Sequence, residues 1–315
     1  MKYTISVVIP VYNSEKILPE LYSLLKVELI ELTRKYEIIF VNDGSRDHSW
    51  NVIQKLGKKN TRVIGINLNK NYGQHNALLC GIRAAKYDLV LTMDDDLQHP
   101  PEEIQKLLKT YDHNEFDVVY GIPKQLPHSF WRNFFSKTTK TIIAKLIGVP
   151  GVRNISSFRL FHTDLRESFE DFRSPDVIID ALLSWGATRY GSVFINESPR
   201  TKGHSNYNFQ KLMKMGLLIL TGFSTTPLRF ASFLGFGFTI FGVIILFYVL
   251  IRYLLEGSIP GFPFLASIIT IFSGTELFAL GIFGEYLGHI FERSSQRPPY
   301  IIANKIAKKE FKNND

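Results

Sequence analysis

The stretch YEIIFVNDGS, residues 36–45, passes from an apolar run to a series of polar turn formers. A short apolar run bounded by such residues is typical of a strand that is buried on both faces. The same pattern recurs in ISVVIPVYN (5–13), TRVIGINL (61–68), LVLTMDDD (89–96) and FDVVYGIP (116–123). We therefore expect the first part of the chain to form a series of strands, each ending in a polar turn.

Longer amphipathic stretches separate these strands, near residues 16–35, 46–58, 74–86 and 101–112. This alternation of strands and helices predicts an α/β fold, in which helices cover both faces of a mostly parallel sheet. In such sheets ligands bind beyond the carboxyl ends of the strands. The polar residues that follow the strands are therefore the first candidates for a functional site.

Composition limits the class of protein. The chain has 315 residues and 13% of them are aromatic, which excludes a disordered protein. Cys80 is its one cysteine, so a disulfide within the chain is impossible and a reducing compartment is expected. The net charge of +8 suits nucleic acid, anionic lipid or phosphorylated substrates. The opening MKYTISVVIP is predicted to be a strand rather than a signal peptide, which places this end in the cytoplasm.

Three consecutive acids, Asp94, Asp95 and Asp96, follow one of the predicted strands. Alternate residues of a strand share a face, so Asp94 and Asp96 are expected to project together while Asp95 turns aside. With the carbonyl of Gln98 they form an all-oxygen set that suits Mg²⁺ or Mn²⁺. The alternative is capping of a helix that begins at PPEE (100–103), which accounts for one acid but not for three.

Two further polar turns are candidates for a nucleotide site. Asp43 can accept hydrogen bonds from ribose hydroxyls or from a base N–H, or it can be an ordinary turn aspartate. The stretch NKNYGQHNAL (69–78) places Asn and Gly before a helix, where exposed backbone N–H groups can meet a nucleotide.

The second half of the chain is more apolar. Residues 230–251 carry no charge, and we predict transmembrane helices at 229–252 and 262–286, joined as a hairpin. Two long core helices of a soluble domain are the alternative. Glu276 in the second stretch is either functional or a packing contact. Basic residues in the tail 287–315 predict that both termini and the domain 1–205 are cytoplasmic.

Two basic amphipathic segments, 129–148 and 206–226, are expected to lie in the membrane interface. The first could equally pack against the sheet as an ordinary amphipathic helix. The second leads directly into the first apolar stretch, which favours an interfacial position.

Taken together, these motifs carry a resemblance. VVIPVYN, VNDGS, NYGQHNAL and DDDLQHPPE resemble the nucleotide-sugar-binding domain, of the GT-A type, of family 2 glycosyltransferases. SSFRLF (156–161), RTKGHSNYN (200–208), FSTTPLR (223–229) and GIFGEYLGHIFERSSQRPPYII (281–302) resemble its polyprenyl-phosphate glycosyltransferases, which include dolichol-phosphate mannose synthases and bactoprenol glucosyltransferases. The resemblance covers nearly the whole chain.

The resemblance implies a role for each matching position. The residues that it places against the nucleotide, with uracil as the expected base, are Pro10, Tyr12, Asn13, Asp43, Asn71, Gly73, Asp94 and Asp95. Asp96 and Gln98, with Asp94, are expected to hold the metal. The residues expected to meet phosphates of the donor or the lipid acceptor are Arg132, Arg159, Arg200 and Ser205. Asp94, Asp96, Arg159 and Arg200 are thus the predicted catalytic set.

The sequence departs from the family pattern at three positions. Asn13 stands where many relatives have an acid, and Asp95 where many have a small residue. His162 stands where some relatives have an Asp, which puts a catalytic-base role for the nearby Asp164 in doubt. A base is also unnecessary, because a polyprenyl phosphate is already anionic and can attack the anomeric carbon directly.

The implied function is inverting transfer of one sugar from a UDP-sugar to polyprenyl (undecaprenyl) phosphate, for modification of cell-envelope glycans. The implied setting is the inner membrane, with the bilayer as a partner and a homo-oligomer, a tetramer, as the expected assembly. The sequence leaves the sugar open between glucose or a related hexose and a modified aminoarabinose. A non-catalytic scaffold or lipid-linked-sugar translocator is the alternative from another class. The sequence lacks the Gln-x-x-Arg-Trp motif of processive polysaccharide synthases, so that class is not expected. A nucleic-acid partner is not expected either.

Overall fold

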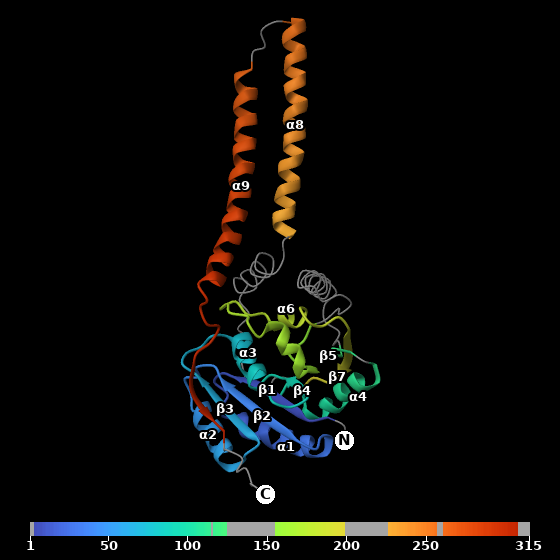
Figure 1. The fold of residues 1–315 in the computed structure, drawn as a ribbon, viewed down its shortest axis with the longest axis vertical. Coiled ribbons are helices and arrows are strands. Elements are labelled where there is room, and N and C mark those ends of the chain that lie inside the picture. Colours follow the sequence, from blue (N-terminus) through green and yellow to red (C-terminus); the bar gives the residue numbers. More distant parts are fainter. Residues whose placement is uncertain (1–2, 115, 125–154, 199–225, 257–260, 308–315) are drawn as a thin grey trace. The chain divides into compact units, whose positions relative to one another are not determined.

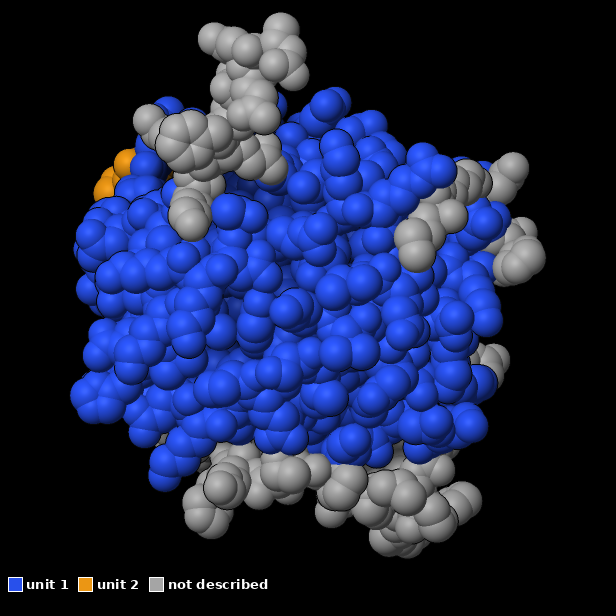
Figure 2. Space-filling model, turned by 90° about the horizontal axis from the view of Figure 1, so that it is seen from below, with its two compact units in different colours: residues 1–208, 296–315 blue, residues 209–295 orange. Residues whose placement is uncertain are grey.

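The computed structural model describes residues 3–114, 116–124, 155–198, 226–256 and 261–307. The chain divides into two compact units. Unit 1 comprises Met1–Asn208 and Gln296–Asp315, and unit 2 comprises Phe209–Ser295 (Figure 2). Each unit is described by itself.

The described part of unit 1 is built on an eight-stranded sheet of order β7-β5-β6-β4-β1-β2-β3-β8. Its strands are β1 (Ile5–Val11), β2 (Tyr36–Asn42), β3 (Val63–Leu68), β4 (Leu89–Thr92), β5 (Val118–Pro123), β6 (Arg159–His162), β7 (Tyr190–Ile195) and β8 (Ile302–Ile306). The central strands β4, β1, β2 and β3 run parallel, as do β5 and β7, whereas β6 and β8 pair antiparallel with their neighbours. The predicted mostly parallel α/β fold is confirmed.

The helices follow the expected alternation. They are α1 (Leu18–Leu32), α2 (Ser49–Lys59), α3 (Gln74–Ala84) and α4 (Ile104–Asn114), with the short η1 (Pro101–Glu103), η2 (Thr163–Phe169) and α6 (Ile179–Leu183). Apolar residues recur every three or four positions of α1 and are buried, so this helix covers the sheet with one stripe. In Figure 1, α1 and α2 lie on one side of the sheet and α3 and α6 on the other. Helices therefore cover both faces.

The strand β8 revises the predicted division of the chain. The sequence predicts that 287–315 is a basic tail, but Ile302–Ile306 pairs antiparallel with β3 and forms an edge of the sheet. The Asn69 N–H also donates to the carbonyl of Ile301 at 3.1 Å, a normal length for such a bond. The chain therefore returns to the sheet of unit 1 after its apolar helices.

Unit 2 contains two long helices, α8 (Thr226–Glu256) and α9 (Phe262–Ser294). They pack through an edge-to-face contact of Phe238 with Phe272, whose ring centroids are 5.7 Å apart. Among the described helices, α8 is the one found long and apolar enough to cross a membrane, over Pro227–Leu255. The second span and the membrane hairpin stay predictions.

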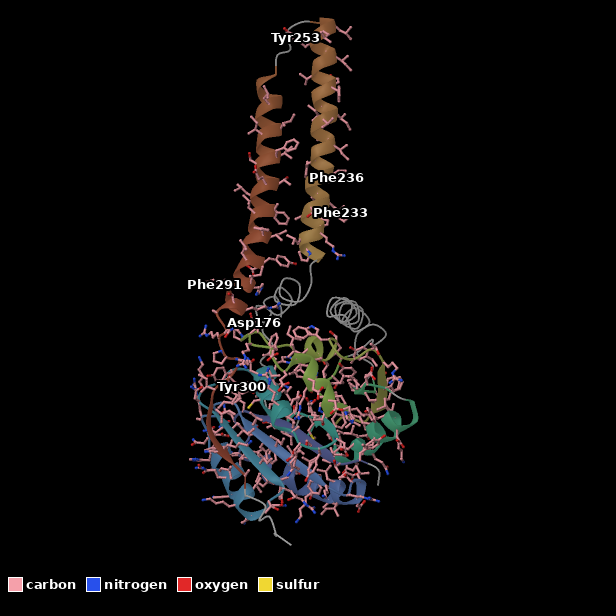
Figure 3. All side chains as sticks on the ribbon, in the orientation of Figure 1. Asp176, Phe233, Phe236, Tyr253, Phe291 and Tyr300 are labelled. Atoms are coloured by element: carbon pink, nitrogen blue, oxygen red, sulfur yellow. The ribbon has the colours of Figure 1, made fainter. Side chains whose placement is uncertain are left out.

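The surface of α8 is apolar in all directions. Phe233 and Phe236 project outward from it (Figure 3), with exposed fractions of 74% and 66%. A helix that is apolar all round is typical of a membrane span or of the core of a large protein. The segment 129–148, and 206–225 of the second predicted interfacial helix, lie outside the described residues.

Candidate nucleotide and metal site

The site lies where the carboxyl ends of β1, β2, β3 and β4 meet at one edge of the sheet. These four neighbouring strands are parallel, so the turns that follow them come together although they are far apart in sequence. The predicted nucleotide and metal residues are on these turns. Switch points of this kind are the usual ligand sites of α/β sheets.

The carboxylate of Asp43 holds the turn that precedes α3. Its Oδ1 accepts a hydrogen bond from the Tyr72 N–H at 2.7 Å, and its Oδ2 accepts one from the Gly73 N–H at 2.9 Å. Asp43 is buried, with 3% of its surface exposed. Burial raises the pKa of Asp43, and the two backbone N–H groups oppose this rise. The residue predicted to contact the nucleotide therefore also shapes the Asn71–Gly73 turn.

The next residue, Gly44, is required by the same arrangement. Its φ of +63° is left-handed, and a Cβ added there would lie 2.5 Å from the Lys70 carbonyl carbon and against the Asn71 nitrogen. Only glycine allows the turns after β2 and β3 to approach so closely. Gly73 has a φ of +96° and directly precedes α3.

Asn13 links the turns after β1 and β2. Its φ is +57°, its N–H donates to Ser45 Oγ at 3.0 Å, and its Oδ1 accepts from the Arg46 N–H at 2.8 Å. An asparagine tolerates this left-handed conformation better than most residues do. Tyr12 beside it is exposed. Pro10 lies earlier, buried within β1 opposite Val41, so it reaches the site through the strand rather than from a turn.

The first two acids of the triplet have different partners. Asp94 Oδ1 accepts from Gln74 Nε2 at 2.6 Å, and its Oδ2 accepts from Ser157 Oγ at 2.7 Å. Asp95 Oδ2 accepts from Ser14 Oγ at 2.5 Å and from the Tyr12 N–H at 3.2 Å. Asp94 is thus bound to α3 and to the residues before β6, and Asp95 to the turn after β1. Because β4 ends at Thr92 and residues 95–97 form a bend, strand alternation does not account for this division, and a shared metal role of Asp94 and Asp96 stays a prediction.

The third acid turns back on its own loop. Asp96 Oδ1 accepts from the Gln98 N–H at 3.1 Å, and Leu97 between them has a φ of +59°. Burial raises the pKa of Asp94, with the Ser157 hydroxyl opposing the rise and the charge of Asp96 adding to it. Burial also raises the pKa of Asp95, to about 6.

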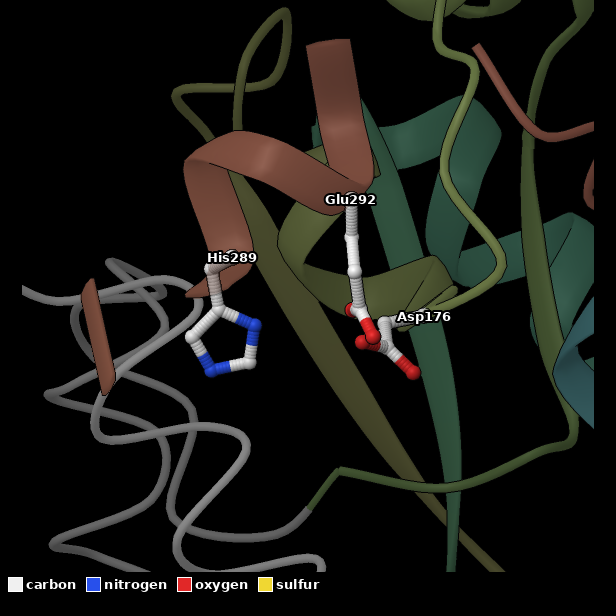
Figure 4. Close-up of side chains that lie close together, drawn as sticks. All are labelled: Asp176, His289 and Glu292. Atoms are coloured by element: carbon white, nitrogen blue, oxygen red, sulfur yellow. The ribbon is translucent and has the colours of Figure 1, made fainter. Parts of the chain in front are cut away.

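These residues fit a divalent cation by their chemistry. Asp94, Asp96 and Gln98 offer carboxylate and amide oxygens, the ligands that Mg²⁺ and Mn²⁺ prefer. Burial is the main cause of the raised pKa of Asp94, and the charge of Asp96 adds to it; a bound cation would offset this repulsion between the two carboxylates. Their metal role stays a prediction. Figure 4 draws three other potential ligands, Asp176, His289 and Glu292, which belong to both units, so no metal site is assigned to them.

Arg159 has partners that the resemblance does not imply. It is 1% exposed, forms an ion pair with Asp180, and its Nε donates to Thr92 Oγ1 at 3.1 Å. Tyr120 donates its hydroxyl to the same Asp180 at 2.9 Å. The described structure therefore places Arg159 in a buried pair rather than at an open phosphate site. The physical reason is the pairing of β6 with β4, which sets Arg159 opposite Thr92 inside the sheet.

Other predicted residues lie elsewhere or are not described. Arg132, Arg200 and Ser205 fall outside the described residues. The side chain of Asp164 is 75% exposed and its carboxylate lies 3.2 Å from His162 Nδ1, which does not favour it as a catalytic base.

The sequence did not predict which side chains donate hydrogen bonds to Asp94 and Asp95. Gln74, Ser157 and Ser14 are polar residues within or beside motifs already recognised, yet nothing in their spacing assigns them to a particular carboxylate. The buried pairing of Asp180 could have been predicted from the sequence. It is a lone acid in the apolar stretch VIIDALL, and an acid in such a place requires a buried partner.

Comparison with known proteins identifies the family of the chain. The model of the family described as "Glycosyl transferase family 2" matches residues 6–169, more than half of the chain. An undecaprenyl-phosphate 4-deoxy-4-formamido-L-arabinose transferase of Shewanella sediminis is 34% identical over 302 residues, covering 95% of this chain and 91% of that protein. The protein of the same name from Proteus mirabilis is 33% identical and covers 99% of this chain and 97% of its own.

Among solved structures, glucosyl-3-phosphoglycerate synthase from Mycobacterium tuberculosis, in complex with Mn²⁺, UDP-glucose and phosphoglyceric acid, has a TM-score of 0.49 at 17% identity, covering 70% of this chain and 78% of its own. TarS of S. aureus in complex with UDP-GlcNAc has a TM-score of 0.44 at 19% identity, covering 71% and 74%. The family match over the sheet and its turns, and relatives that match nearly end to end, confirm the resemblance to polyprenyl-phosphate glycosyltransferases. The chain belongs to glycosyl transferase family 2.

Proposed function

We propose that this enzyme transfers a single sugar from a UDP-sugar to undecaprenyl phosphate at the cytoplasmic face of the membrane. The observation that carries the proposal is the edge of the sheet where Asp43, the turn before α3 and the acids 94–96 come together. The acceptor is supported by the relatives, which match nearly the whole chain and are named for undecaprenyl phosphate.

The proposed donor sugar is a modified arabinose, because both relatives are named for 4-deoxy-4-formamido-L-arabinose. The motif NYGQHNAL also favours relatives that transfer modified arabinose, whereas the C-terminal motifs favour glucosyltransferases. Glucose or a related hexose is therefore the alternative donor, and a panel of UDP-sugars separates the two.

The chemistry we propose is direct displacement. The anionic phosphate of the acceptor attacks the anomeric carbon, the bond to the UDP oxygen breaks, and the configuration inverts. Mg²⁺ or Mn²⁺, when bound, neutralises charge on the departing diphosphate. Asp96 and Gln98, with Asp94, are the proposed ligands, and Asp43 with the Asn71–Gly73 turn is proposed to receive the nucleotide. The enzyme's contribution is then positioning and charge stabilisation rather than proton transfer.

We place α8 and α9 in the inner membrane as a hairpin, with both termini in the cytoplasm. The apolar surface of α8 supports this arrangement.

A homo-oligomer is proposed as well, with a tetramer as the expected form. Gly274, Gly281 and Gly288 of α9 recur every seven residues, and a Cβ added to any of them would meet nothing within 4 Å. Phe272, which contacts α8, lies on the other side of the helix at 3.6 residues per turn. A small-residue face of this kind allows close packing of another helix in a membrane.

The test is release of UDP by the purified full-length protein with Mg²⁺ or Mn²⁺, undecaprenyl phosphate and a panel of UDP-sugars. We expect release to require the lipid phosphate and to fall sharply in Asp96→Asn. No release with any UDP-sugar would refute the proposed reaction. An Asp96→Asn variant that keeps full function in cells would favour the scaffold or translocator instead.

A further inference from the structure

The strand pairing behind the acids brings the SSFRLF motif close to Asp94. In the antiparallel pair of β4 and β6, Leu91 lies opposite Leu160 and Thr92 opposite Arg159. Two residues beyond this last pair, outside the strands, the Ser157 hydroxyl meets the carboxylate of Asp94.

Two neutral donors hold the Asp94 carboxylate. Ser157 Oγ donates to Oδ2 at 2.7 Å and Gln74 Nε2 donates to Oδ1 at 2.6 Å. One donor comes from the residues before β6 and the other from the first turn of α3, so rotation of the carboxylate would break at least one bond. Each carboxylate oxygen can accept more than one hydrogen bond, so both remain able to bind a ligand.

A buried chain of contacts fixes Ser157 in turn. Thr92 Oγ1 donates to the Ser157 carbonyl at 2.6 Å and accepts from Arg159 Nε at 3.1 Å. Arg159 is paired with Asp180, and all three side chains are buried. The contacts therefore run without a gap from Asp180 through Arg159, Thr92 and Ser157 to Asp94.

On the other side, α3 positions Gln74. Gly73 precedes it and donates its N–H to Asp43, and His75 after it accepts from the Ile179 N–H at 3.4 Å. Residues on both sides of Gln74 are thus tied to the sheet and to α6, although the Gln74 side chain itself is exposed.

We infer that Gln74 and Ser157 are positioning residues, which hold the Asp94 carboxylate in the orientation that receives the donor diphosphate and its metal. Arg159 acts on the same carboxylate through Thr92 and Ser157. The inference rests on the proposed function, because it is the donor site that gives the orientation of Asp94 a purpose.

The variants are chosen to remove one donor each. We expect Ser157→Ala and Gln74→Ala each to lower kcat/KM about tenfold, the value of one hydrogen bond to a charged group. Ser157→Thr keeps the hydroxyl and is expected to recover most of the loss. Gln74→Glu replaces the donor by a second carboxylate and is expected to be worse than Gln74→Ala. Ser168→Ala and Gln105→Ala, on exposed positions elsewhere, are the matched controls.

The measurements separate positioning from folding. UDP release is followed against UDP-sugar and Mn²⁺ concentration, Mn²⁺ binding in the presence of UDP is measured by electron paramagnetic resonance, and the melting temperature is recorded for each variant. We expect weaker Mn²⁺ binding and a higher half-saturating Mn²⁺ concentration in both alanine variants, with melting temperatures near that of the wild type.

The inference is overturned if both alanine variants bind Mn²⁺ and turn over like the wild type, or if Ser157→Thr is as impaired as Ser157→Ala. If Ser157→Ala fails to fold, the exposed Gln74 still decides the question. A wild type that binds Mn²⁺ with UDP but releases no UDP refutes the proposed reaction alone, because the binding comparison still tests the two residues. A wild type that binds no Mn²⁺ overturns the inference as well.

Discussion

Replacing Gly44 by alanine tests whether the close approach of two turns builds the nucleotide site. The alanine Cβ would lie 2.5 Å from the Lys70 carbonyl carbon, and both it and the adjacent Asn71 nitrogen are backbone atoms that cannot rotate away. The turns must separate by roughly 0.9 Å to restore the 3.4 Å of an ordinary contact. The left-handed φ of +63° adds a second cost, since a Cβ disfavours it.

The expected magnitude follows from these two contributions. The left-handed conformation costs about 1 kcal/mol and the overpacking about 2 kcal/mol, so the free energy of unfolding should fall by about 3 kcal/mol. For a domain of this size that corresponds to a melting temperature lower by roughly 6 to 12 °C. Separation of the turns should also break the hydrogen bonds of Asp43 to Tyr72 and Gly73, and so weaken UDP binding.

Gly57→Ala is the matched control. Gly57 lies within α2, and its added Cβ would meet the side chain of Ile306 at 3.2 Å, which can adjust. Scanning fluorimetry gives the melting temperature and calorimetric titration gives the affinity for UDP. The reasoning is wrong if Gly44→Ala melts and binds UDP like the wild type, or if Gly57→Ala is equally impaired.

Three further outcomes are expected. Burial lowers the pKa of His75 to about 4, with Asp180 opposing and Arg159 adding to the shift, so the folded state binds fewer protons than the unfolded one below pH 6.5. The free energy of unfolding should therefore fall by about 1 kcal/mol between pH 8 and pH 5.5. This fall should be smaller in His75→Gln but unchanged in the control His48→Gln, whose histidine is exposed, and urea unfolding at each pH measures it. Asp180→Ala should cost about 3 to 5 kcal/mol by leaving Arg159 unpaired, with Asp180→Asn milder, and equal unfolding midpoints would contradict the buried pair. Burial raises the pKa of Cys80 to about 12, so iodoacetamide at pH 8 should leave it unmodified until urea unfolds the protein, which intact-mass spectrometry would reveal.

The strands and helices around the site could be predicted from the sequence because their signals are local. Runs such as 36–42 are apolar on both faces since helices cover both faces of the sheet, and the turn formers stand where each strand ends. The parallel order then brings the turns together, which is why Asp43 and the acid triplet could be expected at one edge.

The strand β8 could not be predicted in the same way. Its side chains are mostly exposed, so the segment 302–306 has no apolar alternation to mark it. Its pairing with β3 spans more than two hundred residues, across both long helices. Such a pairing depends on backbone hydrogen bonds at the edge of a sheet, which carry little sequence signal.

Arg159 shows a different limit of prediction from the sequence, which concerns the partner of a charged side chain. An arginine in a motif of a phosphate-handling family can meet a phosphate or a carboxylate, because its guanidinium binds both in the same way. The sequence identifies the cation but not its partner, which here is Asp180 from a segment twenty-one residues away. Neither strand periodicity nor motif spacing connects the two.

The acids of this site have a second role that follows from where parallel strands end. Turns beyond a parallel sheet leave backbone N–H groups without ladder partners, and a nearby carboxylate can accept from them. Asp43 accepts from two such groups and Asp95 from one, while Asp47 accepts from Glu15 and Ser49.

Apart from the local bond from Ser49 to Asp47, these bonds tie one turn to another, so the carboxylates assemble the edge of the sheet on which the donor is proposed to bind. Asp94 differs because both of its described donors are side chains, and Asp96 because it accepts within its own loop. Removing Asp43 or Asp95 should therefore loosen the bonds that join neighbouring turns, whereas changing Asp96 should alter metal binding.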